Sequence, residues 1–263
     1  MFDICGFLLC LTFILSFTVI TWGLSLALNN VAIVDSLWPL LFIVAAFSYA
    51  AGLDQPELRS YMVLVLVTAW GIRLFLYLSW RSWGADEDYR YQNIRRKNEP
   101  NFWIKSLYLV FGLQGVLAWI ISLPLMVAVT GNTEFGFLDW LGLGVWIIGF
   151  GFESLGDCQL ARFRRNPENK NRVLQSGLWR YTRHPNYFGD FCVWWGFYLI
   201  ALSAGGWWSI FSPILMTALL LKITGVLLLE KDIGKRRPEY VGYINHTNAF
   251  FPWSRKQSKN LEK

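Results

Sequence analysis

Three long stretches of this sequence contain no charged residue, and each is long enough to cross a lipid bilayer. They are residues 4–28, 106–133 and 191–221. A helix needs roughly 20 consecutive apolar residues to span the hydrocarbon core, where no water is present to solvate charges. Only 16% of the 263 residues are charged, against roughly 25% in soluble domains. The sequence therefore predicts an all-α, polytopic integral membrane protein that forms a single membrane domain over residues 1–263.

Hydropathy and turn residues divide the chain into about seven spans. The first apolar run has Asp3 and no basic residue at its head. Because a cleaved signal peptide begins with a positively charged region, we expect a retained span here. The predicted spans cover residues 4–28, 31–51, 60–80, 104–129, 138–160, 187–204 and 207–229.

Basic residues are concentrated in three of the connecting segments. Residues 81–105, 159–185 and 231–263 contain six, seven and eight Lys and Arg, which is 21 of the chain's 24. Basic short loops stay on the cytoplasmic side. We therefore expect an outside N-terminus and a cytoplasmic C-terminus, in a bacterial inner membrane or a eukaryotic endoplasmic reticulum. Nucleic acid is an unsuitable partner, because the cations flank membrane spans.

Several charged residues fall within the predicted spans, where a charge is costly and usually has a role. Asp35 heads the second span, Glu153 and Asp157 lie four residues apart on the fifth, and Asp190 enters the sixth. A polar cavity open to the cytoplasm would explain Asp35, Arg73, Glu153 and Asp157 together. The alternative for each is an interhelical ion pair or a side chain that reaches the interface. We favour that alternative for Arg59, Arg81 and Lys222.

A dense motif lies at residues 177–190, GLWRYTRHPNYFGD. Pro185 suits the first turn of a helix. A helix start preceded by Arg180, Arg183 and His184 suits an anionic group such as a pyrophosphate. A basic loop that binds anionic lipid head groups fits the same pattern.

The sequence Arg183-His184-Pro185-Asn186-Tyr187, after Gly177-Leu178-Trp179, resembles the C-terminal region of the steroid 5α-reductase superfamily. The resemblance is clearest over residues 140–253 and is nearest to an uncharacterised, largely bacterial branch. It extends through the segments 153–157, 163–164, 236–240 and 251–252, with Glu230, Tyr243 and Thr247.

This resemblance implies a membrane reductase that uses NADPH and a lipophilic substrate. It implies that Tyr77 hydrogen-bonds the substrate carbonyl, with Asp35 as its carboxylate partner. Hydride transfer to the β-carbon of a conjugated enone would leave an enolate, and Tyr77 would stabilise or protonate its oxygen. The cofactor-binding residues that the resemblance implies, together with those of the motif, are Glu153, Asp157, Arg164, Arg172, Arg183, His184, Asn186, Tyr187, Asp190, Glu230 and Tyr243.

Two other functions compete with the reductase. Isoprenylcysteine carboxyl methyltransferases carry a similar pentapeptide, which favours a membrane methyltransferase that uses S-adenosylmethionine. The basic loops favour instead a ligand with several phosphates. The other alternative is a non-enzymatic lipid-binding protein. A metal site is not expected, because the four cysteines form no CxxC pair and the chain has two histidines. Residues 86–91 fit either a segment that closes over the cofactor or a solvated loop.

Overall fold

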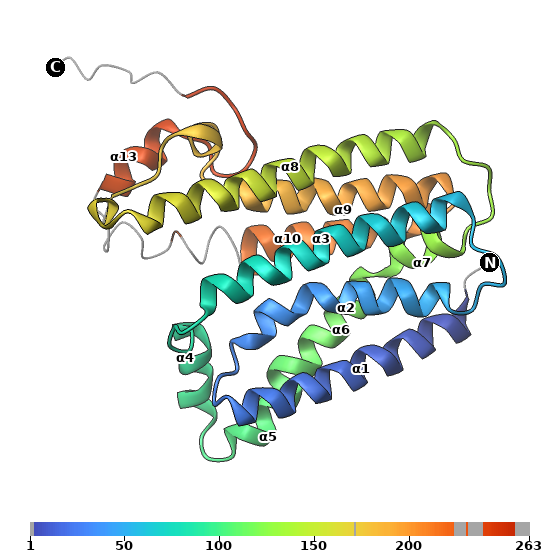
Figure 1. Ribbon diagram of the computed structural model, residues 1–263, viewed down its shortest axis with the longest axis horizontal. Coiled ribbons are helices and arrows are strands. Elements are labelled where there is room, and N and C mark those ends of the chain that lie inside the picture. The colour runs from blue at the N-terminus through green and yellow to red at the C-terminus, as the bar shows by residue number, and fades with distance from the viewer. Residues whose placement is uncertain (1–2, 171, 224–229, 231–238, 256–263) are drawn as a thin grey trace. The chain divides into compact units, whose positions relative to one another are not determined.

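The computed structural model describes residues 3–170, 172–223, 230 and 239–255, and helices make up most of this part (Figure 1). Within it there is no β-strand, and one isolated bridge pairs Thr182 with Asn248. The predicted all-α class is confirmed. The helical elements are α1 (Ile4–Ala27), α2 (Ile33–Ala50), α3 (Leu58–Ser82), α4 (Tyr89–Asn98), α5 (Phe102–Ser106), η1 (Leu107–Gly112), α6 (Leu113–Ile121), α7 (Leu123–Thr130), α8 (Phe137–Arg165), η2 (Pro167–Asn169), η3 (Gly177–Arg180), α9 (Pro185–Ser203), η4 (Trp207–Ile210), α10 (Phe211–Ala218), η5 (Leu219–Ile223) and α13 (Glu239–His246).

Five helical stretches are long and apolar enough to cross a membrane, and they match the first five predicted spans. Helix α9 stands in place of the sixth. Asn186 and Asp190 in its first turns lower its mean hydropathy, and it is not among the five. The seventh is represented by a shorter apolar helix, Trp207–Lys222, and residues 224–229 of that prediction lie outside the described residues. The total of seven stays a prediction. The five stretches are Ile4–Ala27, Ile33–Ala50, Leu58–Ser82, Phe102–Ile121 and Phe137–Arg165.

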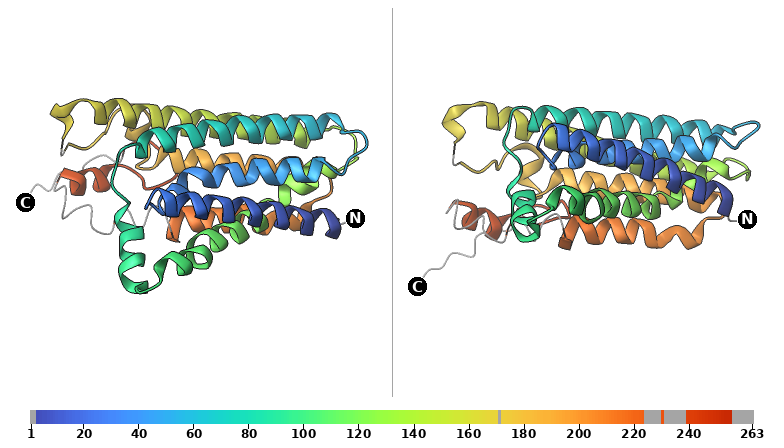
Figure 2. Two further views of the ribbon diagram at one scale, coloured as in Figure 1. Left: turned by 60° about the horizontal axis from the view of Figure 1, so that its bottom comes forward. Right: turned by 90° about the horizontal axis from the view of Figure 1, so that it is seen from below.

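The chain divides into two compact units. The first comprises Met1–Asp139 and Ile200–Ser212, and the second comprises Trp140–Leu199 and Pro213–Lys263. In the first unit α1, α2 and α3 run side by side (Figure 2). Their contact is apolar, and the rings of Phe42 and Trp70 meet edge to face with centroids 5.8 Å apart. Gly71 allows α3 to approach α2, because a Cβ there would lie 2.9 Å from the Ile43 side chain.

A fully buried ion pair closes one end of the first unit. Arg59 at the start of α3 is 1% exposed, and Asp139 in the first turn of α8 is 0% exposed. Arg59 Nε donates to Asp139 Oδ1 at 2.7 Å, and its Nη1 and Nη2 donate to the carbonyls of Thr133 and Glu134 at 2.9 and 2.8 Å. Each buried charge is thus paired and hydrogen-bonded, as burial requires. The prediction of a structural role for Arg59 is confirmed.

The fourth predicted span is not one regular helix. It begins as α5, continues as a π-helical segment, η1, and ends in α6 and α7, which are separated at Ser122 before Pro124. A π-helical turn shifts the side chains that follow it relative to a regular α-helix. Here Gln114 follows it by two residues, and its side chain donates to Tyr91 Oη at 3.2 Å.

In the second unit α8 and α9 are in backbone contact. A Cβ on Gly149 would lie 2.6 Å from the carbonyl oxygen of Gly189, and a Cβ on Gly189 would lie 2.4 Å from the backbone nitrogen of Glu153. Glycine at both positions is therefore required for this approach, as at many close contacts between membrane helices. The contact places the middle of α8, with Glu153, against the first turns of α9.

Candidate functional site

Two carboxylates of α8 are buried in the second unit. Glu153 and Asp157 are each 3% exposed. They lie four residues apart, so both are on the same face of the helix. Asn186 in the first turn of α9 donates from Nδ2 to Asp157 Oδ1 at 3.3 Å, and Asp190, one turn further, is also buried. The structure thus brings together four of the predicted cofactor residues, Glu153, Asp157, Asn186 and Asp190, at the α8–α9 contact.

The chain that leaves α8 returns to it before α9 begins. Gly177 has a φ of +61°, and a Cβ there would lie 2.5 Å from Gln159 Oε1. The same Gln159 oxygen accepts a hydrogen bond from the Leu178 backbone nitrogen at 3.0 Å, and Trp179 Nε1 donates to the Gly156 carbonyl at 3.1 Å. The Gly-Leu-Trp segment of the motif therefore fixes the loop on α8 just before Arg183 and His184.

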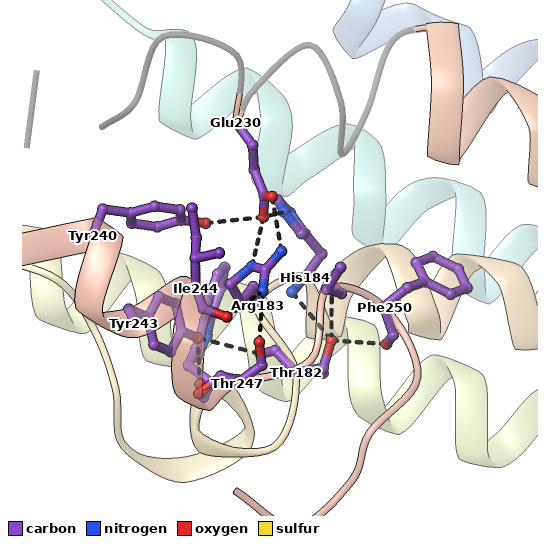
Figure 3. A network of polar contacts seen from close by, with 11 residues as sticks. Thr182, Arg183, His184, Glu230, Tyr240, Tyr243, Ile244, Thr247 and Phe250 are labelled. Carbon is purple, nitrogen blue, oxygen red and sulfur yellow. Dashed lines mark hydrogen bonds and ion pairs between the residues drawn. The ribbon is translucent and has the colours of Figure 1, made fainter. Parts of the chain in front are cut away.

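Arg183 is the centre of a buried polar network (Figure 3). Its Nε and Nη2 donate to the two carboxylate oxygens of Glu230 at 2.7 and 2.8 Å. Its Nη1 donates to the carbonyls of Thr247 and Ile244 at 2.5 and 3.2 Å. His184 Nε2 lies 2.9 Å from Glu230 Oε1 and donates to this ionised carboxylate. We call this group, with Thr182, Tyr240 and Tyr243, the Arg183 network.

The network joins the C-terminal segment to the loop before α9. Thr182 Oγ1 donates to the Phe250 carbonyl at 2.7 Å, and the Arg183 backbone nitrogen donates to the Asn248 carbonyl at 2.9 Å. Tyr243 Oη donates to the Trp179 carbonyl. Residues 243–250 are therefore fixed against residues 179–184 by both backbone and side-chain hydrogen bonds.

The charges of the network shift the pKa values of its acids. Burial alone would raise the pKa of Glu230, but hydrogen bonds from His184 and Arg183 and the guanidinium charge outweigh it and lower the pKa of Glu230 to about 2. Burial, reinforced by the nearby carboxylate, raises the pKa of Tyr240 well above its usual value. Burial likewise raises the pKa of Tyr243. At neutral pH, Glu230 is thus ionised and both tyrosines keep their protons.

Arg183 therefore differs from the anion-binding residue that the sequence suggested. Its Nε, Nη1 and Nη2 all donate to protein oxygens.

Two other arginines predicted to bind the cofactor, Arg164 and Arg172, are exposed, at the end of α8 and in the loop after it. The ring of Tyr187 stacks on His184 with centroids 5.5 Å apart. Arg236 and Arg237, in the C-terminal segment that resembles the steroid 5α-reductase superfamily, lie outside the described residues.

A second polar cluster lies in the first unit, around Asp35. Tyr91 on α4 donates from Oη to Asp35 Oδ1, and Arg90 Nη2 donates to Asp35 Oδ2 at 2.7 Å. Burial, then the charge of Asp35, raises the pKa of Tyr91, so it keeps its proton. The family resemblance pairs Asp35 with Tyr77, and the sequence does not predict the contact with Tyr91. The acids and tyrosines of segment 86–91 are the sequence signal for this cluster.

Tyr77 lies on α3, half-buried, with the guanidinium of Arg81 5.7 Å from its ring centroid and the Trp80 ring 6.3 Å away. Helix α4 is held near Asp35 by Glu87, whose Oε1 accepts from the Val31 backbone nitrogen and from Arg95 Nη2, each at 2.8 Å. Within the described ranges, no group of three or more His, Cys, Asp or Glu residues could hold a metal ion.

A family model described as a protein of unknown function, DUF1295, matches residues 21–247. The chain belongs to this family. An uncharacterised protein of Schizosaccharomyces pombe is 28% identical to this DUF1295 chain over 265 residues, which is 89% of the chain and 76% of the relative. The 3-oxo-5-alpha-steroid 4-dehydrogenase 1 of Bos taurus is 32% identical over 76 residues, 26% of the chain and 30% of that enzyme. No solved structure matches the DUF1295 chain.

Proposed function

We propose that this chain is a membrane-embedded reductase that uses NADPH to reduce the conjugated C=C bond of a lipophilic enone. The observation that carries the proposal is the pair of carboxylates on α8, Glu153 and Asp157, each 3% exposed inside a membrane helix. Buried ionisable groups at membrane depth are costly and mark functional sites by default. Weak similarity to a bovine steroid dehydrogenase supports the same activity class.

The donor set around these carboxylates fits a dinucleotide. Buried carboxylates accept hydrogen bonds from ribose hydroxyls and from a carboxamide, and Asn186, which contacts Asp157, can both donate and accept. The exposed Arg164 and Arg172 suit the phosphates, because guanidinium groups bind them bidentately. When bound, NADPH would supply a hydride. The chain's own residues would bind, orient and exclude water.

The Arg183 network takes a positioning role in this proposal. Arg183, His184, Glu230 and Tyr243 hydrogen-bond to one another or to the backbone of residues 179–182 and 244–247. These contacts hold the start of α9, and so Asn186, in a fixed place. The resemblance-based cofactor role of these four residues is thereby proposed to be indirect.

The proton side of the reaction is assigned to a tyrosine beside Asp35. Reduction of an enone adds hydride at the β-carbon, and the resulting enolate needs a hydrogen bond or a proton at its oxygen. Tyr77 is the donor that the family resemblance implies. Tyr91 is a second candidate, because its hydroxyl already donates to Asp35. Asp35 accepts hydrogen bonds from Tyr91 Oη and Arg90 Nη2 and so orients the Tyr91 hydroxyl.

Binding of the purified, detergent-solubilised chain to NADPH, NADH and S-adenosylmethionine tests the proposal. A ligand that binds only the folded state raises the unfolding temperature by mass action. We expect a shift with NADPH. Asp157→Asn removes a charge-assisted acceptor, worth about 1.5–3 kcal/mol, and weakens NADPH binding at least tenfold.

The matched control is Glu168→Gln, an acid-to-amide change at an exposed position in η2. It should leave NADPH binding unchanged. A shift with S-adenosylmethionine alone would replace the proposal with methyl transfer. No shift with any of the three ligands, in a chain that remains folded, would favour a non-enzymatic lipid-binding protein.

A further inference from the structure

Three aromatic side chains of the second unit are exposed on the segments that meet at the Arg183 network. Tyr181 is 46% exposed, Phe251 is 61% exposed and Trp253 is 71% exposed. Two arginines, Arg180 and Arg255, are exposed beside them. We call these five residues the tail patch. They are separate from the predicted cofactor residues.

The tail patch is one continuous surface. The Trp253 backbone nitrogen donates to the Tyr181 carbonyl at 3.1 Å, which joins the two segments directly. Arg255 Nη2 donates to the Gln175 side-chain oxygen at 3.0 Å, so the last described residue is also held against the loop. The patch therefore depends on the C-terminal segment being folded against the loop before α9.

The contacts of Phe251 locate the tail patch relative to the start of α9. Its ring centroid lies 6.1 Å from that of Phe188 and 5.8 Å from that of Phe191. These two rings are in the first and second turns of α9, the helix in place of the sixth predicted span. Residues three and six positions into a helix lie roughly 5 and 9 Å along its axis. With α9 as the predicted sixth span, Phe251 would lie near the boundary between head groups and acyl chains, where aromatic side chains are favoured.

The exposed charges of the tail patch are positive and favour an anionic partner. The segments 174–184 and 247–255 contain no Asp or Glu, and the sequence continues with Lys256, Lys259 and Lys263 against Glu262. Of the two other basic residues in these segments, Arg183 is paired with Glu230 and His184 contacts the same carboxylate. The exposed charges are then positive, next to exposed aromatic rings. We propose that the tail patch binds the anionic head groups of the membrane leaflet next to it.

The experiment follows amide hydrogen exchange in residues 247–255 of the full chain in lipid nanodiscs. One nanodisc contains phosphatidylcholine alone, and the other contains about equal amounts of phosphatidylcholine and phosphatidylglycerol. The Trp253 amide reports directly, because it is bonded to the Tyr181 carbonyl. Each arginine near an anionic surface contributes about fivefold to association. We expect exchange to be roughly 20-fold slower in the anionic nanodisc.

The double variant Arg180→Gln/Arg255→Gln should lose this slowing, and Arg180→Lys/Arg255→Lys should keep most of it. The control Arg162→Gln/Arg165→Gln removes the same charge from exposed positions at the end of α8. It should retain the slowing. Equal exchange in the two nanodiscs, or equal loss with the control, would overturn the proposal.

Two further outcomes identify other occupants. If Phe251→Ser/Trp253→Ser speeds exchange equally in both nanodiscs while the arginine variants have no effect, the patch binds lipid without regard to charge and the proposal is wrong. If protection persists in detergent and grows with protein concentration, a second copy of the chain covers the patch, which also overturns it. Neither outcome depends on NADPH binding.

Discussion

Substituting alanine for Asp139 would leave Arg59 buried without its ion-pair partner. Arg59 is 1% exposed and donates two hydrogen bonds to this carboxylate, at 2.7 and 3.0 Å. Removing one member of a buried pair typically costs 3–5 kcal/mol, because the other charge stays buried and uncompensated. The remaining bonds from Arg59 to two backbone carbonyls offset part of this cost. We therefore expect Asp139→Ala to destabilise the chain by about 3–4 kcal/mol.

The reverse change is expected to cost somewhat less. In Arg59→Met, Asp139 still accepts from the Gly136 backbone nitrogen at 2.8 Å and from Ser203 Oγ at 2.6 Å. Two carbonyls lose a donor, at about 1 kcal/mol each, and the partly compensated charge of Asp139 adds about 1 kcal/mol, so the total is about 3 kcal/mol. The double variant Arg59→Met/Asp139→Leu buries no charge, but two carbonyls and the Gly136 and Ser203 donors lose their partners at about 1 kcal/mol each, so it should cost about 4 kcal/mol. The single changes are then strongly non-additive.

Unfolding in mixed micelles of increasing sodium dodecyl sulfate content, followed by circular dichroism, measures all three variants. Ser16→Ala, at an exposed position of α1, is the control and should fall within about 0.5 kcal/mol of wild type. A cost below about 1 kcal/mol for Asp139→Ala would show that the pair contributes little. A double variant that costs as much as the two single variants together would refute the argument from uncompensated charge.

Three other outcomes are expected. Tyr77→Phe and Tyr91→Phe should be compared for turnover at saturating NADPH: the proton donor's loss lowers turnover 10²-fold or more, roughly, without changing cofactor affinity, and two unaffected variants would remove the tyrosine assignment. Arg164→Ala should weaken binding of NADPH more than of NADH, whereas Arg183→Ala should weaken both equally through the loss of the network; the reverse pattern in equilibrium binding would contradict these roles. The folded pKa of Glu230 is lowered to about 2, so its contribution to stability, on the order of 3 kcal/mol, is full above its unfolded pKa of 4.5 and is lost as the pH falls toward 2. The difference in unfolding free energy between wild type and Glu230→Gln should therefore stay constant above about pH 5 and disappear in acid. A difference that disappears on the alkaline side would exclude this origin.

The features that the sequence could predict are those that depend on local composition. Five of the predicted spans appear as helices because about 20 apolar residues in a row specify a membrane helix wherever they occur. Glu153 and Asp157 share a face for the same local reason, the helical repeat. Arg59 could be assigned a structural role because it lies at the end of a span. Its partner Asp139, 80 residues away, was not identified.

The contacts of Arg183 and Asp35 depend on tertiary structure, and the sequence did not predict them. Arg183 stood beside a helix start, a pattern that suits an anionic ligand, but a carboxylate 47 residues further along the chain satisfies it instead. Asp35 is paired with Tyr77 by the family resemblance. Its hydroxyl partner, Tyr91, is on a short helix outside the spans, where periodicity carries no information about direction. A cation next to a ligand motif can serve the fold as easily as the ligand.

The backbone contact between Gly149 and Gly189 fixes the positions of nearby acidic side chains before any ligand binds. Because no side chain separates α8 from α9 at this point, Glu153 and Asp190 cannot move apart without opening the contact. Their arrangement is thus set when the protein folds. A ligand that these acids bind would lose little affinity to the ordering of its site, so its binding should carry a small entropic cost.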